Sequence, residues 1–152
     1  EFEEVGSLQI VDYLKPVIEW HEKEMVPLGK GLNDDPRCQY VHGDFFELSL
    51  GEGYQSKATT HHAILLDIDH SPAHLLTKDN ARFYSTGGLR KFAERIKSGG
   101  IFGLWSDDPP EASFLESLNE VFARVESHVV PFHNPIQDEE FESTVYVATK
   151  AR

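Results

Sequence analysis

Two carboxylates and an imidazole follow a short apolar run near the middle of the chain. The run Ala63–Leu66 contains no polar residue, and Asp67, Asp69 and His70 come directly after it. Such a run is typical of a strand that is covered on both faces of a sheet. Open α/β sheets bind ligands at the carboxyl ends of their strands. Because neighbouring titratable groups perturb each other's proton affinity, we predict Asp67, Asp69 and His70 as catalytic residues, with helix capping as the alternative.

Two further acids are expected at the ends of strands. The segment Ser7–Leu14 predicts a strand with Asp12 near its carboxyl end, and Cys38–His42 predicts a strand closed by Gly43 and Asp44. Side-by-side strands would bring Asp12, Asp44 and Asp67 to one rim. For Asp12 the alternative is capping of the next helix, and for Asp44 it is a role within a turn.

The remaining N-terminal elements follow from spacing and from turn residues. A helix is expected directly after Ser7–Leu14, because six residues lie at helical spacing: Leu14, Val17, Ile18, His21, Met25 and Leu28. A turn region should follow it, marked by Gly29, Gly31, Asn33 and Pro36. We expect Phe45–Leu50 to pack back on the sheet and Gly51–Thr60 to form a loop.

The C-terminal half predicts three helices and three strands. Pro72 suits the first turn of a helix, and a helix around Leu89–Ile96 should end at the sequence Ser98-Gly99-Gly100. Asp108 and Glu111 have the spacing of a helix start before apolar residues that include Phe114, Leu115, Leu118, Val121, Phe122 and Val125. The predicted strands are Ile101–Trp105, Ser127–Phe132 and Ser143–Thr149, the last two joined by a loop over His133–Glu142.

Strands and helices thus alternate until two strands follow each other at the end. Alternation predicts an α/β protein with a Rossmann-like, mostly parallel sheet and helices on both faces. The closing pair of strands predicts a C-terminal antiparallel hairpin. At 152 residues the chain fits one domain over residues 1–152.

This order of elements resembles the class I S-adenosylmethionine-dependent methyltransferase fold. Within that methyltransferase-type fold it resembles the spermidine synthase-like (polyamine aminopropyltransferase) branch. The similar segments together span about residues 7–149; they are Ile10–Glu19, His42–Phe46, Ile64–Pro72 and Lys97–Phe102. The family's Gly-rich turn would lie upstream of Ser7, so we expect a domain fragment that begins at the second strand and has weak or no catalysis alone. The family's Asp-x-x-Asp arrangement is replaced here by Asp67-Ile-Asp69-His70.

The resemblance implies a cofactor, S-adenosylmethionine or its decarboxylated form, and the residues that hold it. Asp12 would accept hydrogen bonds from the ribose hydroxyls, since an ionised carboxylate is an acceptor only. Asp44 would face the adenine amino group, with Phe45 against the ring.

The resemblance also implies transfer of an aminopropyl or methyl group to a cationic amine. Asp67 would orient the ammonium and take its proton, a role that Asp69 or His70 could share. Tyr84 and Trp105 would line the substrate side, and the alternative for both aromatic residues is a place in the core. A second hypothesis is a catalytically inactive fragment with an assembly or partner-binding role, for example as a homodimer.

Composition limits the partners. The formal net charge of −12 disfavours nucleic acid, because Lys and Arg bind phosphate backbones, and it is compatible with a cationic substrate. No run approaches the ~18 apolar residues of a membrane span, so no membrane partner is expected. Cys38 is the single cysteine, which favours a reducing cytoplasm. No metal site is expected, because only His61 with His62 and His70 with His74 lie close in sequence.

Overall fold

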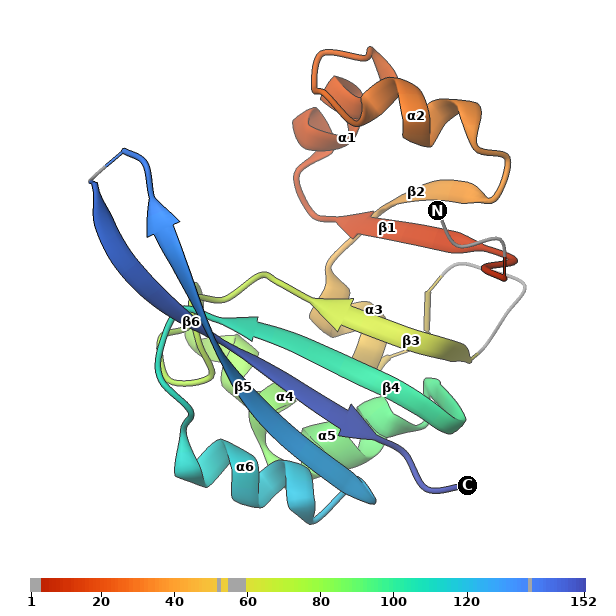
Figure 1. The fold of residues 1–152 in the computed structure, drawn as a ribbon. Coiled ribbons are helices and arrows are strands. Elements are labelled where there is room, and N and C mark those ends of the chain that lie inside the picture. Colours follow the sequence, from red (N-terminus) through yellow and green to blue (C-terminus); the bar gives the residue numbers. More distant parts are fainter. Residues whose placement is uncertain (1–3, 52, 55–59, 137) are drawn as a thin grey trace. The chain divides into compact units, whose positions relative to one another are not determined.

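The computed structural model describes residues 4–51, 53–54, 60–136 and 138–152. These residues form two compact units, an N-terminal unit (Glu1–Ser56) and a C-terminal unit (Lys57–Arg152), both drawn in Figure 1. One domain over the whole chain therefore stays a prediction. The predicted loop Gly51–Thr60 falls largely on residues 52 and 55–59, which lie outside the described residues.

The N-terminal unit contains one pair of parallel strands. β1 (Leu8–Asp12) and β2 (Cys38–His42) run side by side, with Asp12 opposite His42. Both predicted strands are confirmed, and β2 has the predicted bounds. The helices of this unit are α1 (Lys15–Glu22), α2 (Gly29–Asp34) and α3 (Phe45–Leu50).

The turn region predicted after α1 is wrong, because α2 occupies most of it. The Asn33 side chain donates hydrogen bonds to the carbonyl oxygens of His21 and Glu22, at 3.0 and 3.2 Å, and so joins α2 to the end of α1. A Cβ at Gly29 would lie 2.7 Å from the carbonyl oxygen of His21, so this glycine permits a close helix contact. Gly29 therefore permits the close packing of α2 against α1 and does not mark a turn.

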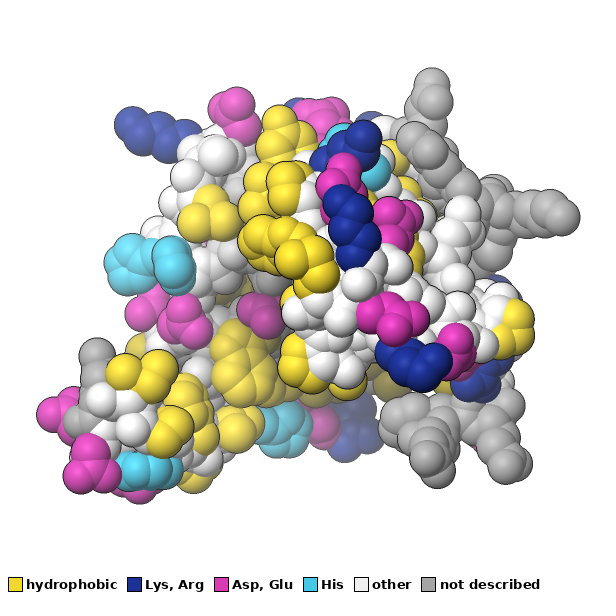
Figure 2. Space-filling model, turned by 90° about the horizontal axis from the view of Figure 1, so that it is seen from above, with side chains coloured by type: hydrophobic (Ala, Val, Ile, Leu, Met, Phe, Trp, Pro, Cys, Tyr) yellow, Lys and Arg dark blue, Asp and Glu magenta, His cyan; other side chains and the backbone are white. Residues whose placement is uncertain are grey.

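Apolar side chains around α1 are exposed on the surface of the N-terminal unit. Figure 2 shows hydrophobic side chains gathered over this part of the chain. The helix ends at Glu22, and Glu24 adopts a positive φ of 56° that prevents its continuation. The helix predicted from the spacing of Leu14 to Leu28 is therefore shorter than expected, and three of the spaced side chains are 57–70% exposed: Leu14, Met25 and Leu28.

The C-terminal unit contains a four-stranded mixed sheet in the order β3-β4-β6-β5. β3 (His61–Leu66) is parallel to β4 (Ile96–Ser106), whereas β6 (Glu139–Thr149) is antiparallel to both β4 and β5 (Arg124–Asn134). A short 3₁₀ turn, η1 (Lys78–Asn80), precedes the helices α4 (Ala81–Tyr84), α5 (Thr86–Ala93) and α6 (Ala112–Asn119). The α/β class and the C-terminal antiparallel hairpin are thereby confirmed.

The helices α4, α5 and α6 pack against one face of this sheet. Phe102 on β4 is fully buried, and its ring lies 4.8 Å from that of Phe92 on α5, centroid to centroid. Tyr146 on β6 meets Phe114 on α6 at 5.1 Å. On the other face Leu65 is 79% exposed, so the predicted cover on both faces of Ala63–Leu66 is wrong in this structure.

The predicted end of the helix at Ser98-Gly99-Gly100 is also wrong. α5 ends at Ala93, and β4 already begins at Ile96, which is 1% exposed. A Cβ at Gly100 would lie 2.8 Å from the carbonyl oxygen of His62 on the neighbouring strand. Gly100 therefore allows two strand backbones to approach closely, whereas the sequence pattern suggested a helix stop.

No helix begins at Pro72, in contrast to the prediction. Residues 67–77 form an irregular loop in which Ser71 and His74 exchange backbone hydrogen bonds, at 3.2 and 3.4 Å. Asp108 likewise does not cap α6, whose N-cap residue is Glu111. The carboxylate of Asp108 instead accepts a hydrogen bond from Ser71. This contact between the loop after β3 and the segment before α6 accounts for both wrong predictions, the helix at Pro72 and the cap at Asp108.

The last two strands are longer than predicted. α6 ends at Asn119, so Val121 and Phe122 follow the helix, and Val125 already belongs to β5. The loop predicted over His133–Glu142 is mainly strand, and cross-strand pairs continue to Asn134 opposite Glu139. Figure 1 shows this part of the hairpin projecting past the end of β4. Because a projecting hairpin is solvated on both faces, its strands carry polar side chains, and the sequence analysis took this polar segment for a loop.

Among the described residues, no helix is long and apolar enough to cross a membrane.

Candidate functional site

Asp12 and Asp44 lie at the same edge of the N-terminal unit. β1 and β2 are parallel neighbours, and the two acids occupy or follow their carboxyl ends. Asp12 Oδ1 accepts a hydrogen bond from the backbone N–H of Leu14 at 2.7 Å. Asp44 caps α3, because its Oδ1 accepts from the N–H groups of Phe46 and Glu47 at 2.8 and 3.3 Å. Among the described residues, Oδ2 of neither acid has a donor, so each carboxylate keeps one oxygen for a ligand.

Phe45, which the resemblance places against the adenine ring, is buried in the N-terminal unit. It is 6% exposed, and its ring packs against Phe46 and Tyr54, with centroids 5.5 and 5.9 Å away. The ring therefore belongs to the core, and contact with adenine stays a prediction that this burial disfavours.

The carboxyl ends of β3 and β4 form a second polar edge, within the C-terminal unit. Asp67 is exposed, and no described residue donates a hydrogen bond to its carboxylate. His70 is held in place by Asp107, which follows β4: the backbone N–H of Asp107 donates to the His70 carbonyl at 2.7 Å, and His70 Nδ1 lies 3.2 Å from Asp107 Oδ2. The structure thus brings His70 to a carboxylate that the sequence did not indicate.

Asp108 makes a second set of contacts at this edge. Its Oδ2 accepts a hydrogen bond from Ser71 Oγ at 2.5 Å and lies 2.5 Å from Nδ1 of His74. These contacts were missed by the sequence analysis, which assigned Asp108 to a helix cap. The signal was present, since Asp107 and Asp108 follow a strand end as Asp67 does.

The hydrogen bond from Ser71, with a smaller contribution from His74, lowers the pKa of the Asp108 carboxyl group below its ordinary value, against the opposing effect of desolvation. A carboxylate with a lowered pKa in the folded state stabilises the fold above its unfolded pKa. That stabilisation is lost as the pH falls through the folded pKa. We therefore expect NMR titration to give Asp108 a pKa below 3.8.

In the Ser71→Ala variant the pKa of Asp108 should rise toward 3.8, because the principal donor is gone. Glu126, another acid with a lowered pKa in the same unit, receives its main hydrogen bond from Arg124 and should titrate unchanged. An unchanged Asp108 pKa in this variant would show that Ser71 does not stabilise the carboxylate.

Asp69 has the contacts of a structural residue. It is 4% exposed, and its two oxygens accept hydrogen bonds from Leu76 N, Asn80 Nδ2 and Tyr84 Oη at 2.7–3.1 Å. Burial, followed by the charge of Asp69, raises the pKa of Tyr84, so its hydroxyl remains a donor. Because the oxygens of Asp69 are buried and already accept hydrogen bonds from this chain, the geometry favours the exposed Asp67 over Asp69 for contact with a substrate.

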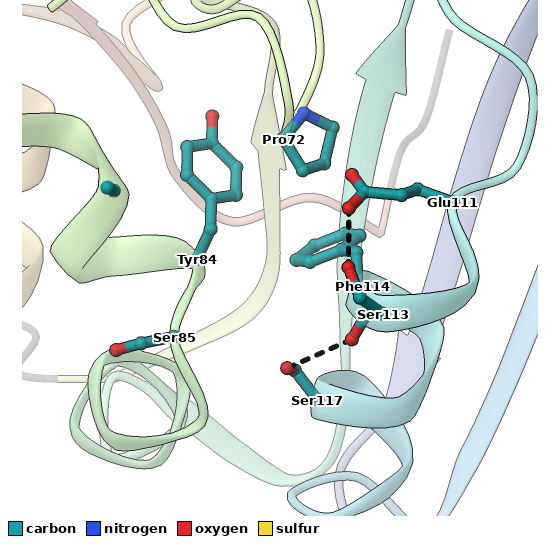
Figure 3. A pocket seen from close by; sticks show the side chains of 8 residues that line it. Pro72, Tyr84, Ser85, Glu111, Ser113, Phe114 and Ser117 are labelled. Atoms are coloured by element: carbon teal, nitrogen blue, oxygen red, sulfur yellow. Dashed lines mark hydrogen bonds between the residues drawn. The ribbon is translucent and has the colours of Figure 1, made fainter. Parts of the chain in front are cut away.

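The two predicted substrate aromatics lie in different environments. Tyr84 is 7% exposed, and its ring centroid lies 5.7 Å from that of Phe114. This agrees with the alternative that Tyr84 is a core residue, although Tyr84 also lines a cavity (Figure 3). Trp105 on β4 lies opposite Val145 and is half-buried. A substrate contact by either residue stays a prediction.

Comparison with solved structures identifies the fold. A spermidine synthase from Thermotoga maritima superposes with a TM-score of 0.69 at 15% identity over 99% of this chain and 47% of its own. Human methyltransferase-like protein 13 in complex with SAH gives 0.65 at 15% identity over 96% and 61% of the two chains. A SAM-dependent O-methyltransferase from Thermotoga maritima gives 0.59 at 18% identity over 97% and 51%. This chain has the class I methyltransferase fold.

These superpositions confirm that the structure is similar to spermidine synthases, as the sequence led us to expect. No family model matches the sequence, and no curated protein matches it. The chain spans about half the length of the spermidine synthases to which it is similar.

Within this class I methyltransferase fold, the described residues include no group of three or more His, Cys, Asp or Glu placed to hold a metal ion. The two histidine pairs noted in the sequence therefore do not form such a group in the described part of the chain.

Proposed function

We propose that this chain is the nucleoside-binding part of a transferase that uses S-adenosylmethionine or its decarboxylated form. The observation that carries this proposal is the pair Asp12 and Asp44, two acids at one carboxyl edge that each keep an oxygen without a donor among the described residues. Similar proteins support it: a spermidine synthase was solved with the transition state analogue AdoDATO, and human methyltransferase-like protein 13 with SAH.

The chemistry of the two acids fits a nucleoside. A ribose presents two hydroxyl donors and adenine presents an amino donor, and ionised carboxylates only accept hydrogen bonds. Asp12 would hold the ribose hydroxyls and Asp44 the amino group. When bound, the cofactor supplies an alkyl group activated by a sulfonium. The reaction would be transfer of an aminopropyl or methyl group.

Asp67 is the proposed residue for the acceptor amine. Its carboxylate is exposed and has no donor among the described residues, so it can orient an ammonium group and take the proton from its nitrogen. His70 follows three positions later and is fixed by Asp107 at 3.2 Å, which makes it the second candidate for holding that proton. The net charge of −12 favours the approach of a cationic substrate.

Isothermal titration of the full chain with methylthioadenosine tests the nucleoside site. In Asp12→Asn the amide oxygen can still accept from Leu14 N, but an NH₂ group replaces the oxygen left for the ribose. We expect binding to weaken by roughly tenfold or more, because hydrogen bonds to charged groups contribute about 1.5–3 kcal/mol.

The matched control is Asp34→Asn, an exposed acid of the same unit whose carboxylate pairs with Lys30 and with no other described residue. Its affinity for methylthioadenosine should equal that of the wild type. Equal affinity in Asp12→Asn and wild type, or no binding by the wild type, would refute the nucleoside site. The inactive fragment with an assembly role stays a prediction.

A further inference from the structure

The amino ends of β3 and β4 carry basic side chains and no acid. Three segments form this part of the sheet, residues 60–66, 95–106 and 143–152, and none of them contains Asp or Glu. Their basic residues are His61, His62, Arg95, Lys97, Lys150 and Arg152. Figure 1 shows the two amino ends and the C-terminus on the same side of the sheet. The acids of the polar edge described above lie at the opposite, carboxyl ends of the same strands.

An irregularity in the strand pairing brings two of these basic side chains together. Between His61 and Ala63 the register shifts, so that residues 97–100 of β4 form a bulge opposite His62 alone. Lys97 begins this bulge, and its Nζ lies 3.4 Å from Nε2 of His62. An ammonium group is a donor only, so Nε2 accepts in this contact and Lys97 keeps two further N–H groups for other acceptors.

The C-terminal segment is fixed to the same bulge. The carbonyl oxygen of Ala151 accepts hydrogen bonds from Ser98 Oγ at 3.0 Å and from the backbone N–H of Gly99 at 3.2 Å. Gly99 has a positive φ of 73°, and a Cβ placed on it would lie 3.5 Å from Cγ of Arg152. Arg152 therefore lies over the bulge, two positions along β4 from Lys97.

The positive charge at the bulge is not balanced by an acid of the described chain. Neither Lys97 nor Arg152 forms an ion pair with a described residue, whereas Arg90 and Arg124 of the same unit each pair with a glutamate. Burial, followed by the charge of Lys97, lowers the pKa of His61 below its ordinary value. The effect on His61 is the one expected beside a cation without a counter-ion, so the bulge has both the charge and the N–H donors to hold an anion.

We propose that the bulge binds a phosphate group, either inorganic phosphate or the end group of a phosphomonoester. Such a group presents three strong acceptor oxygens, to which Lys97 offers a point charge and Arg152 a planar pair of donors. A carboxylate has only two oxygens, and the net charge of −12 disfavours a nucleic acid. β3 is six residues long, which separates the bulge from the acids at its other end by roughly 20 Å at about 3.3 Å per residue. The site uses neither a nucleoside nor those acids, so it is independent of the function proposed above.

Titrations of the full chain with sodium phosphate and with methyl phosphate, followed by amide NMR at a constant ionic strength of about 0.15 M, test this site. We expect saturable shifts at residues 97–100 and at Arg152. Tighter binding of methyl phosphate would identify a phosphomonoester as the ligand, and tighter binding of sodium phosphate the free ion. Lys97→Gln and Arg152→Gln should each bind roughly tenfold more weakly or less, since each loses a charged donor. Both side chains are exposed, so both variants should fold.

Lys78→Gln is the matched control. Lys78 is an exposed lysine that has no acid partner among the described residues, and it follows the loop at the carboxyl end of β3. This variant should bind both probes as the wild type does, and sodium acetate should bind the wild type at least roughly tenfold more weakly than phosphate, because it has fewer acceptor oxygens. The proposal would be overturned by a lack of saturable shifts at the bulge, by unchanged binding in Lys97→Gln or Arg152→Gln, or by equal binding of acetate. Binding of a DNA oligonucleotide at the bulge without binding of either phosphate probe would also overturn it.

Discussion

Replacement of Phe102 by alanine is expected to lower the free energy of unfolding of the C-terminal unit by about 3–5 kcal/mol. Phe102 is 0% exposed, and its ring contacts those of Phe83, Phe92 and Phe122 at centroid distances of 4.8–6.2 Å. The substitution removes the residue through which three other rings meet and leaves a cavity beneath the helices. Urea denaturation followed by circular dichroism measures the loss.

The neighbouring residue provides the control for this prediction. Ile101 lies on the same strand but on the other face of the sheet, and it is 40% exposed. Ile101→Ala should cost about 1 kcal/mol or less, since little apolar surface is lost from the core. Equal losses in the two variants would contradict a core located on the helix-covered face.

The second large effect is expected for Asp69→Asn, which should destabilise the C-terminal unit by about 3 kcal/mol. Donors from a backbone N–H, an amide and a phenol surround the carboxylate. The NH₂ group of asparagine cannot accept from any of them, so at least one buried donor would lose its partner. Thermal and urea unfolding measure this effect without reference to any catalytic activity.

Asp67→Asn separates this structural role from the proposed chemistry. Asp67 lies two residues earlier and is exposed, so its substitution should change stability by no more than about 0.5 kcal/mol. A neutral Asp69→Asn, or a strongly destabilising Asp67→Asn, would reverse the roles that the structure favours for the two acids.

The sequence predicted an element correctly where local residue patterns alone determine it. β2 has the predicted bounds, β1 lies within its predicted segment, and α1 and β4 contain part of the residues predicted for them. The same spacing placed Asp12 and Asp44 at strand ends, and the structure brings these two acids to one edge because β1 and β2 pair in parallel. Alternating strand and helix patterns fix this arrangement before any tertiary contact is known.

Contacts between distant segments explain what the sequence could not predict. The loop after β3 is not helical, because Ser71 and His74 bind Asp108, which lies more than 30 positions further on. Asp69 resembles a catalytic acid in sequence but is surrounded by donors from residues 76–84. No local pattern distinguishes it from Asp67, because residues two apart in a strand would point to the same face, and the difference arises in the irregular loop that follows Leu66.

The two end strands of the four-stranded sheet differ in the residues that they offer to an added strand. β5 forms one end and carries Pro131, which has no N–H to offer to an added strand. At the other end of the described sheet, β3 has no proline and contains the apolar run Ala63–Leu66. In the C-terminal unit taken by itself, an added strand should therefore pair with β3 more readily than with β5.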